Sequence, residues 1–95
     1  MISSFKKLLR RVLEMFEDVI KMLQQIVNDR TVPRNIRANC EECIKTLEED
    51  KESKSVKINT VISVLDESSN DPNIPMYTRT QIWNIISILE KINKA

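Results

Sequence analysis

Apolar residues recur at steps of three and four along most of the chain, the spacing that places them on one face of an α-helix. The clearest run predicts one long first helix over residues 5–28. Its apolar positions are Phe5, Leu8, Leu9, Val12, Phe16, Val19, Ile20, Leu23, Ile26 and Val27. Ser3 or Ser4 can cap its start, and Asn28 suits a left-handed residue at its end.

The same spacing predicts three further helices. The second begins at Pro33, which is tolerated in the first turn of a helix, with Thr31 as its N-cap. A charged connector of residues 48–55 leads to a third helix that ends near Ser69 and Asn70. Residues 71–75 hold two prolines, which cannot both lie inside a helix, and a fourth helix follows to about residue 92. The apolar positions of these helices are Val32, Ile36, Cys40, Cys43, Ile44 and Leu47, then Val56, Ile58, Val61, Ile62, Val64 and Leu65, then Ile82, Trp83, Ile85, Ile86, Ile88, Leu89 and Ile92.

The chain matches itself when it is shifted by 42 positions. The shared unit is a helix, the turn Asn-Asp-x-x-(Val/Ile)-Pro-x-x-x-Arg, and a second helix. The turn residues are Asn28, Asp29, Pro33 and Arg37 in the first copy, and Asn70, Asp71, Pro75 and Arg79 in the second. We expect a structural turn, in which the Asp accepts hydrogen bonds from helix-start N–H groups and the Arg reaches back to the Asp or to carbonyls of the preceding helix. The alternative is that the Asp and Arg residues of both turns form a polar binding patch.

A repeat of two helices with a period of about 40–47 residues is typical of HEAT and armadillo proteins. Two such hairpins are too few for an open solenoid, but they can pack face to face. The sequence therefore predicts an all-α four-helix bundle built from two duplicated HEAT-like helical hairpins with a long N-terminal helix. We divide the single helical domain 1–95 into an N-terminal helical extension (1–18), a first hairpin (19–49) and a second hairpin (53–94).

Composition argues against most catalytic machinery. The chain has no Gly and no His, which removes phosphate-binding glycine loops, His-based metal sites and His-activated nucleophiles. Cys40 and Cys43 are poorly spaced for a mutual disulfide and supply half a zinc site, so we expect both in the core. A redox pair, or a four-cysteine site shared by two subunits, is the alternative. We therefore expect no enzyme, no cofactor and no metal, although a carboxylate cluster in a helical bundle could bind one.

Two segments are candidate interaction sites. The first helix has a longer apolar seam than its hairpin partner can cover, which favours a homo-oligomer or a protein partner there. The alternative is that the end of this long helix wraps its own bundle. Its start carries Phe5, Lys6, Lys7, Arg10 and Arg11, and these cations are either solvated or a contact patch for phosphate or acidic protein. In the second copy, Tyr77, Arg79 and Trp83 lie in a polar and aromatic run that could anchor a partner. The alternative is that Trp83 fills the end of the core while Thr78 or Thr80 contributes to capping.

Both turns, together with the residues that follow the second one, resemble the archaeal uncharacterised protein family 0147. The resemblance rests on residues 28–37 and 70–85 and covers about residues 19–90. It implies a four-helix fold and an archaeal cytoplasmic protein, and it brings no established activity. The extension 1–18 departs from the family's usual shorter N-terminus. The family tends to have Ala where this chain has Cys40 and Cys43, which favours the core interpretation.

These observations favour a non-catalytic protein-interaction module. The alternative is an RNA- or ribosome-associated protein with a small basic patch. The net charge of +1 gives weak overall attraction to nucleic acid. No stretch approaches the roughly 20 apolar residues of a membrane span, so we expect a cytoplasmic protein without a membrane partner.

Overall fold

The computed structural model describes residue 10 and residues 14–94. It contains the helices α2 (Glu17–Val27), α3 (Arg34–Glu48), α4 (Lys54–Ser69) and α5 (Met76–Lys94). All regular structure in this part of the chain is helical, which confirms the all-α prediction. None of these helices is long and apolar enough to cross a membrane.

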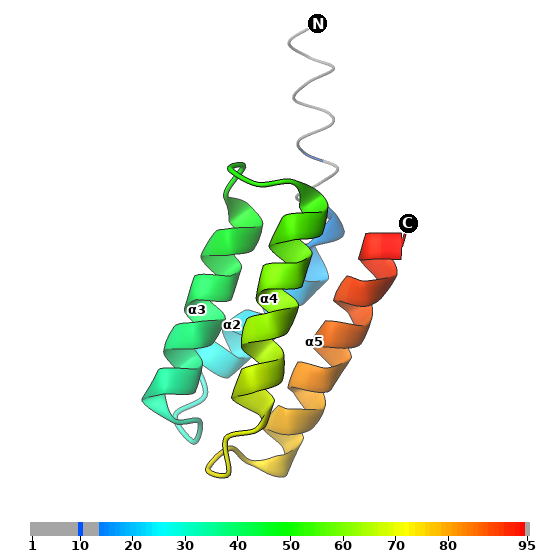
Figure 1. The fold of residues 1–95 in the computed structure, drawn as a ribbon. Coiled ribbons are helices and arrows are strands. Elements are labelled where there is room, and N and C mark those ends of the chain that lie inside the picture. Colours follow the sequence, from blue (N-terminus) through cyan, green and yellow to red (C-terminus); the bar gives the residue numbers. More distant parts are fainter. Residues whose placement is uncertain (1–9, 11–13, 95) are drawn as a thin grey trace, which may run out of the picture.

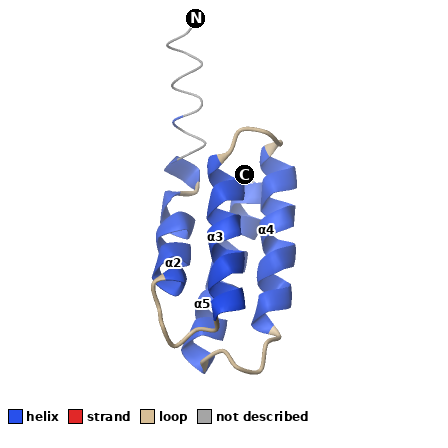
Figure 2. Ribbon diagram, turned by 90° about the vertical axis from the view of Figure 1, so that its left-hand side faces the viewer, coloured by secondary structure: helices blue, strands red, loops and turns tan. Residues whose placement is uncertain are grey.

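The four helices form a closed bundle in which neighbours along the chain run in opposite directions. Each helix packs on the next, and α5 closes the ring by packing on α2. Figure 1 shows the two turns, residues 28–33 and 70–75, together at one end of the bundle, while the α3–α4 loop lies at the other end. The same arrangement is visible from the side in Figure 2. The predicted four-helix bundle is therefore confirmed.

The 42-residue repeat is reproduced in the helix ends. Helix α2 ends at Val27 and α4 at Ser69, while α3 begins at Arg34 and α5 at Met76. The turn backbones also match, since the N–H of Val32 donates to the carbonyl of Asp29, and 42 positions later the N–H of Ile74 donates to the carbonyl of Asp71. The duplicated sequence thus folds into the same helix–turn–helix unit twice.

The core contains residues from all four helices and both turns. Cys40 and Cys43 are buried and form no disulfide. Their equivalent positions in the second copy of the repeat are Ile82 and Ile85, which are also buried. This confirms the two cysteines as core residues. The buried apolar set is Phe16, Val19, Leu23, Ile26, Val32, Ile36, Cys40, Cys43, Ile44, Leu47, Ile58, Val61, Leu65, Ile74, Ile82, Ile85 and Leu89.

The prediction of one continuous first helix is wrong, because the helix is interrupted at Phe16. Residues 14 and 15 are helical, Phe16 forms a turn, and α2 begins at Glu17. The Phe16 side chain is fully buried, and its carbonyl accepts the N–H of Ile20 at 2.8 Å, which starts α2. Residues 1–9 and 11–13, where most of the predicted extension falls, lie outside the described part.

The predicted helix ends are wrong at two residues. Asn28 ends α2 with φ −87°, and no described residue has a positive φ. The helix ends without a left-handed residue because the Asp29 carboxylate accepts a hydrogen bond from the Thr31 N–H, and this side-chain contact stabilises the turn. Thr31 does not cap α3, since its hydroxyl also donates to Asp29. Pro33 holds the N-cap position instead, and its carbonyl accepts from the N–H groups of residues 36 and 37.

Candidate interaction surface

A group of polar side chains joins the two turns. The Tyr77 hydroxyl donates to Asp29 Oδ2 at 2.6 Å, while the Thr31 N–H and hydroxyl donate to Oδ1 at 2.9 and 2.6 Å. From the other hairpin, Asn35 Nδ2 donates to Asp71 Oδ2 at 3.5 Å, which is near the limit for a hydrogen bond. Asn35 and Tyr77 are 42 residues apart, as are Asp29 and Asp71. Each hairpin therefore reaches the turn of the other through equivalent positions.

These contacts change the acidity of Asp29. The Thr31 hydroxyl, the Tyr77 hydroxyl and the Thr31 backbone N–H donate to its carboxylate and hold its pKa below the ordinary value of 3.8. Both aspartates accept a backbone N–H two residues ahead, Asp29 from Thr31 and Asp71 from Asn73. The prediction that they bind helix-start N–H groups is therefore wrong, because both bond within their own turn.

The two turn arginines bind backbone carbonyls. Arg79 Nε donates to the carbonyl of Ser69, the last residue of α4, at 2.9 Å, and its Nη2 donates to the carbonyl of Asp71 at 3.2 Å. Arg37 Nε donates to the carbonyl of Val32 at 3.1 Å. The reach-back to the preceding helix is confirmed for Arg79, whereas Arg37 binds inside its own turn. Tyr77 and Arg79, predicted as interaction residues, thus both make contacts that hold the fold together.

Trp83 remains available to a partner. Its side chain is 53 % exposed, so the alternative that it fills the end of the core is wrong. Met76 lies on the same side of α5 and is 67 % exposed. The exposed positions of α4 up to Ser63 and of α5 up to Ser87 carry no charge. Exposed charged residues follow on the same helices, namely Asp66 and Glu67 of α4 and Glu90, Lys91 and Lys94 of α5. We call the uncharged surface the hairpin-2 face; it comprises Val56, Asn59, Thr60 and Ser63 of α4, and Met76, Thr80, Trp83, Asn84 and Ser87 of α5.

The repeat supplies an internal comparison for this surface. The equivalent positions of the first hairpin are also exposed, and all but one are charged. This hairpin-1 face comprises Glu14, Glu17, Asp18, Lys21, Arg34, Ala38, Glu41, Glu42 and Lys45, in the same order as the nine positions above. Trp83 thus stands where the first copy has Glu41, and Met76 where it has Arg34. The two hairpins share one fold, so folding does not require the missing charges.

Apart from Trp83, the residues of the hairpin-2 face were not predicted as interaction residues, although their signal is in the sequence. Between residues 72 and 89, Arg79 is the one charged residue, and it is used at the turn. The shift by 42 positions aligns this stretch with a charged one. In that alignment the buried stripes of the two hairpins match, whereas the outward positions differ in charge, and this difference is the signal that the predictions missed.

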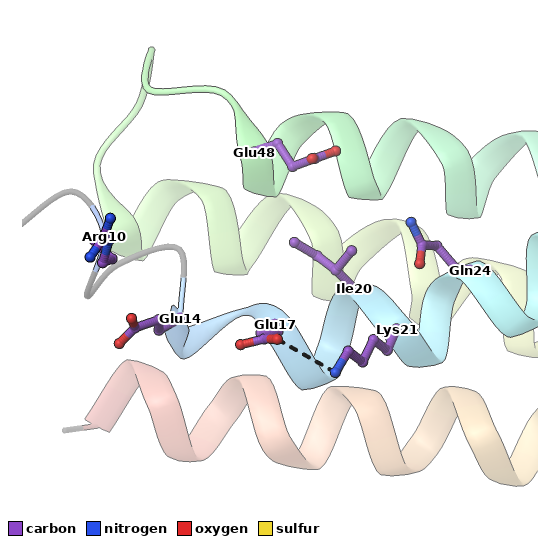
Figure 3. A pocket seen from close by; sticks show the side chains of 7 residues that line it. All are labelled: Arg10, Glu14, Glu17, Ile20, Lys21, Gln24 and Glu48. Carbon is purple, nitrogen blue, oxygen red and sulfur yellow. Dashed lines mark ion pairs between the residues drawn. The ribbon is translucent and has the colours of Figure 1, made fainter.

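The hairpin-1 face contains an open groove along α2 with a cavity volume of about 390 Å³. Figure 3 shows Ile20 between charged and polar side chains from α2, the end of α3 and the segment before α2. The lining residues are Arg10, Glu14, Glu17, Ile20, Lys21, Gln24 and Glu48. Lys21 Nζ lies 3.4 Å from Glu17 Oε1, an exposed i,i+4 ion pair that contributes about 0.3–0.5 kcal/mol at most. This groove has the composition of a solvated helix face.

The basic cluster of the first helix is represented by a single described residue. Arg10 is exposed and lines the groove of Figure 3. Phe5, Lys6, Lys7 and Arg11 lie outside the described residues, so the partner surface predicted for the first helix stays a prediction.

The two cysteines, which are the candidate nucleophiles and metal ligands, lie in the core. Burial raises the pKa of Cys40 and of Cys43 to about 12, which keeps both thiols protonated. In residue 10 and residues 14–94, no group of three or more His, Cys, Asp or Glu side chains is placed to hold a metal ion.

Comparison with known proteins gives one consistent family. The family model described as Uncharacterised protein family (UPF0147) matches residues 5–92, and so includes most of the segment 1–18 that we set apart as a departure. A UPF0147 protein of Methanocaldococcus jannaschii is 49% identical over 79 residues, covering 83% of this chain and 85% of the relative. A UPF0147 protein of Methanothermobacter thermautotrophicus is 48% identical over 81 residues, covering 85% and 79%.

Solved structures agree with this fold. A crystal structure of a UPF0147 protein from Thermoplasma acidophilum has a TM-score of 0.79 and 38% identity, covering 86% of this chain and 98% of that one. A second crystal structure, of the unknown-function protein MMP1188, has a TM-score of 0.76 and 45% identity, covering 80% and 86%.

Proposed function

We propose that this chain, which belongs to the uncharacterised protein family UPF0147, is a non-catalytic interaction module that binds a protein through its hairpin-2 face. The observation that carries the proposal is the contrast between the two faces. At eight of the nine matched positions the first hairpin has a charged residue and the second an uncharged one. The contrast is limited to these positions, since nearer the turn Asp66 and Glu67 are charged where the first copy has Gln24 and Gln25. A face without charges loses less hydration free energy when a partner covers it.

The residue types of the hairpin-2 face support binding to protein. Trp and Met are enriched in the centres of protein interfaces, where charged residues are depleted. Trp83 is more than half exposed, and a side chain of this size gains from being covered. A partner charge buried against Trp83 and the other eight positions would find no opposite charge among them, so we expect the part of the partner that covers these positions to be uncharged.

The non-catalytic part of the proposal rests on the state of the reactive side chains. Cys40 and Cys43 are protonated in the core, and their pKa of about 12 leaves almost no thiolate at neutral pH. The Tyr77 hydroxyl donates a hydrogen bond to Asp29 within the turns. These three side chains therefore serve core packing and the contacts of the turns.

The RNA- or ribosome-associated alternative needs cations, because phosphate contacts dominate binding to nucleic acid. The hairpin-2 face presents none. The basic residues on which the alternative rests are mostly those of the first helix, outside the described part. We therefore treat it as an outcome of the test.

The test compares two matched positions in cells that express the protein. A photoreactive amino acid replaces Trp83 in one variant and Glu41, its equivalent in the first hairpin, in the other. After irradiation, we expect cross-linking to polypeptide at position 83, unaffected by nuclease, and little cross-linking at position 41. Equal cross-linking at both positions would contradict the proposal. Products that disappear with nuclease would support the nucleic-acid alternative.

A further inference from the structure

We propose that an open cavity between α3 and α4 binds a tyrosine side chain of another protein, whose phenol hydroxyl donates a hydrogen bond to Asp71. The cavity has a volume of about 450 Å³ and lies beside the second turn, at the end of the bundle where Figure 1 shows both turns. The described residues that line it do not belong to the hairpin-2 face, so the inference does not rest on the proposed function.

The repeat shows which group this cavity lacks. At the equivalent place in the other copy, Tyr77 of α5 donates to Asp29 Oδ2 at 2.6 Å. Asn35 holds the position of Tyr77 beside Asp71, and its shorter side chain comes only to 3.5 Å of Asp71 Oδ2, near the limit for a hydrogen bond. Asn35 and Asp71 both line the cavity. A phenol therefore binds the turn aspartate in one copy, whereas in the other copy a short amide leaves a cavity at the same place.

Asp71 can accept more hydrogen bonds than it receives. The carboxylate of Asp29 accepts three hydrogen bonds from described donors, at 2.6 to 2.9 Å. The carboxylate of Asp71 accepts the Asn73 N–H on Oδ1 at 2.8 Å and the distant Asn35 amide on Oδ2. Each carboxylate oxygen has two lone pairs, so Oδ2 of Asp71 can take a further donor.

The apolar part of the lining suits an aromatic ring. Ile36, Val64 and Pro72 contribute hydrocarbon surface to the cavity, and Ile36 belongs to the buried core. Tyrosine combines a large apolar ring with a hydroxyl that needs a partner when it is covered. A cavity that offers hydrocarbon surface together with an underused carboxylate oxygen matches both parts of this side chain.

The charges of the cavity indicate where the tyrosine comes from. Its lining, as far as the structure describes it, includes the carboxylates of Glu67 and Asp71 and no basic side chain. The carboxylate of free tyrosine would find only like charges here, whereas a tyrosine within a polypeptide has neutral amides at both ends. The single tyrosine of this chain, Tyr77, is already bonded to Asp29, so the ligand belongs to a different protein.

NMR titration of the isotope-labelled full chain with N-acetyl-tyrosine amide tests the proposal. We expect shifts of the side-chain amides of Asn35 and Asn39 and of the backbone N–H groups of residues 67–71, with a dissociation constant on the order of 1 mM for a ligand of this size. The phenylalanine analogue should bind about tenfold more weakly, because it cannot form the hydrogen bond to the charged carboxylate. Free tyrosine should bind no more tightly than the amide.

Matched variants use the repeat as a guide. Asn35→Tyr introduces the residue of the second copy and should fill the cavity, so that the shifts are lost, whereas Asn35→Ala leaves the cavity open and should keep them. Tyr77→Asn makes the converse change and should add a second set of shifts near Asp29. Asp71→Asn keeps an oxygen for the Asn73 N–H, removes the charge and should weaken binding of the probe about tenfold.

Four results would overturn the inference. These are equal binding of the tyrosine and phenylalanine amides, an unchanged titration in both Asn35→Tyr and Asp71→Asn, no shifts in the wild type up to the solubility limit of the probe, and tighter binding of N-acetyl-arginine amide, which would assign the cavity to a basic side chain. Free tyrosine that binds at least about tenfold more tightly than its amide would refute a polypeptide as the source, because it requires recognition of the charged ends. Cross-linking at position 83 tests the proposed function separately and does not depend on these titrations.

Discussion

At the scale of single residues, Thr78 conflicts with its surroundings. Its side chain is fully buried, and its Oγ1 has no hydrogen-bond partner among the described residues. The first copy has Ile36 at this position, also buried. A buried hydroxyl without a partner costs about 1–3 kcal/mol of stability. The second hairpin thus carries a local defect where the first has an apolar side chain.

Replacing this hydroxyl with a methyl group should stabilise the protein. We expect Thr78→Val to raise the free energy of unfolding by about 1 kcal/mol, because the shape is kept and the unpaired group is removed. Urea denaturation measures the change. Thr46→Val is the control, since the Thr46 hydroxyl already donates to the carbonyl of Glu42 at 3.0 Å and its loss should change stability little. A less stable Thr78→Val variant would show that the hydroxyl is paired.

Asp29 makes a second prediction at this scale, in acid. Hydrogen bonds from Thr31 and Tyr77 lower its pKa in the folded protein below 3.8, so the charged form is favoured by folding. Its contribution to stability is complete above that value and is lost as the pH falls through the lowered pKa. We expect Asp29→Asn to be less stable than wild type near neutral pH, with the difference shrinking as acid protonates Asp29.

Thermal melts between about pH 6 and pH 2 measure this difference. Asp50→Asn, at an exposed position of the α3–α4 loop, is the control and should keep the wild-type pH profile. A difference between Asp29→Asn and wild type that stays constant to the lowest pH would show that the charge of Asp29 does not contribute.

At the scale of helices and turns, the duplicated turn shows what sequence can and cannot supply. Apart from the start of α2 at Glu17, which the pattern placed inside a longer helix, the apolar spacing and the prolines located the described helix boundaries to within a few residues, because burial and backbone restriction act locally. The hydrogen-bond partners within each turn were harder to predict than the helix boundaries. Asp29 has several donors within reach, and its choice of Thr31 over the N–H groups of α3 depends on the shape of the whole turn. The role of Arg79 was predictable, since the end of α4 leaves carbonyls that need donors.

The two turn arginines should differ in their effect on stability. Arg79→Met removes two hydrogen bonds, including the one to the last carbonyl of α4, and we expect a loss of about 2 kcal/mol. Arg37→Met removes one bond to Val32 and should cost about 1 kcal/mol. Urea midpoints at unchanged slope measure both. Equal losses, or a larger one at Arg37, would contradict the assigned role of Arg79 at the end of α4.

At the scale of the whole molecule, the repeat produces one backbone with two different surfaces. The buried stripes of the hairpins match, and this similarity made the fold predictable from the sequence. The hairpin-2 face was not predicted, because only the folded structure shows which of the uncharged positions of α4 and α5 are exposed. Trp83 fits the apolar stripe of α5 in sequence, and its 53 % exposure emerges only when Ile82 and Ile85 take the inward side.

This difference in charge predicts how binding at the hairpin-2 face responds to salt. Raising the ionic strength from 0.1 to 1 M shortens the screening length from about 10 Å to about 3 Å, which weakens contacts that depend on exposed charges. The nine positions of the hairpin-2 face have no charges to screen, and apolar burial is not screened. We therefore expect cross-linking at position 83, repeated in cell extracts at both ionic strengths, to change by less than about threefold. Cross-linking at least about ten times weaker in high salt would instead place charged residues such as Asp66 and Glu67 at the contact, because screening acts on them and leaves Trp83 and Met76 unaffected.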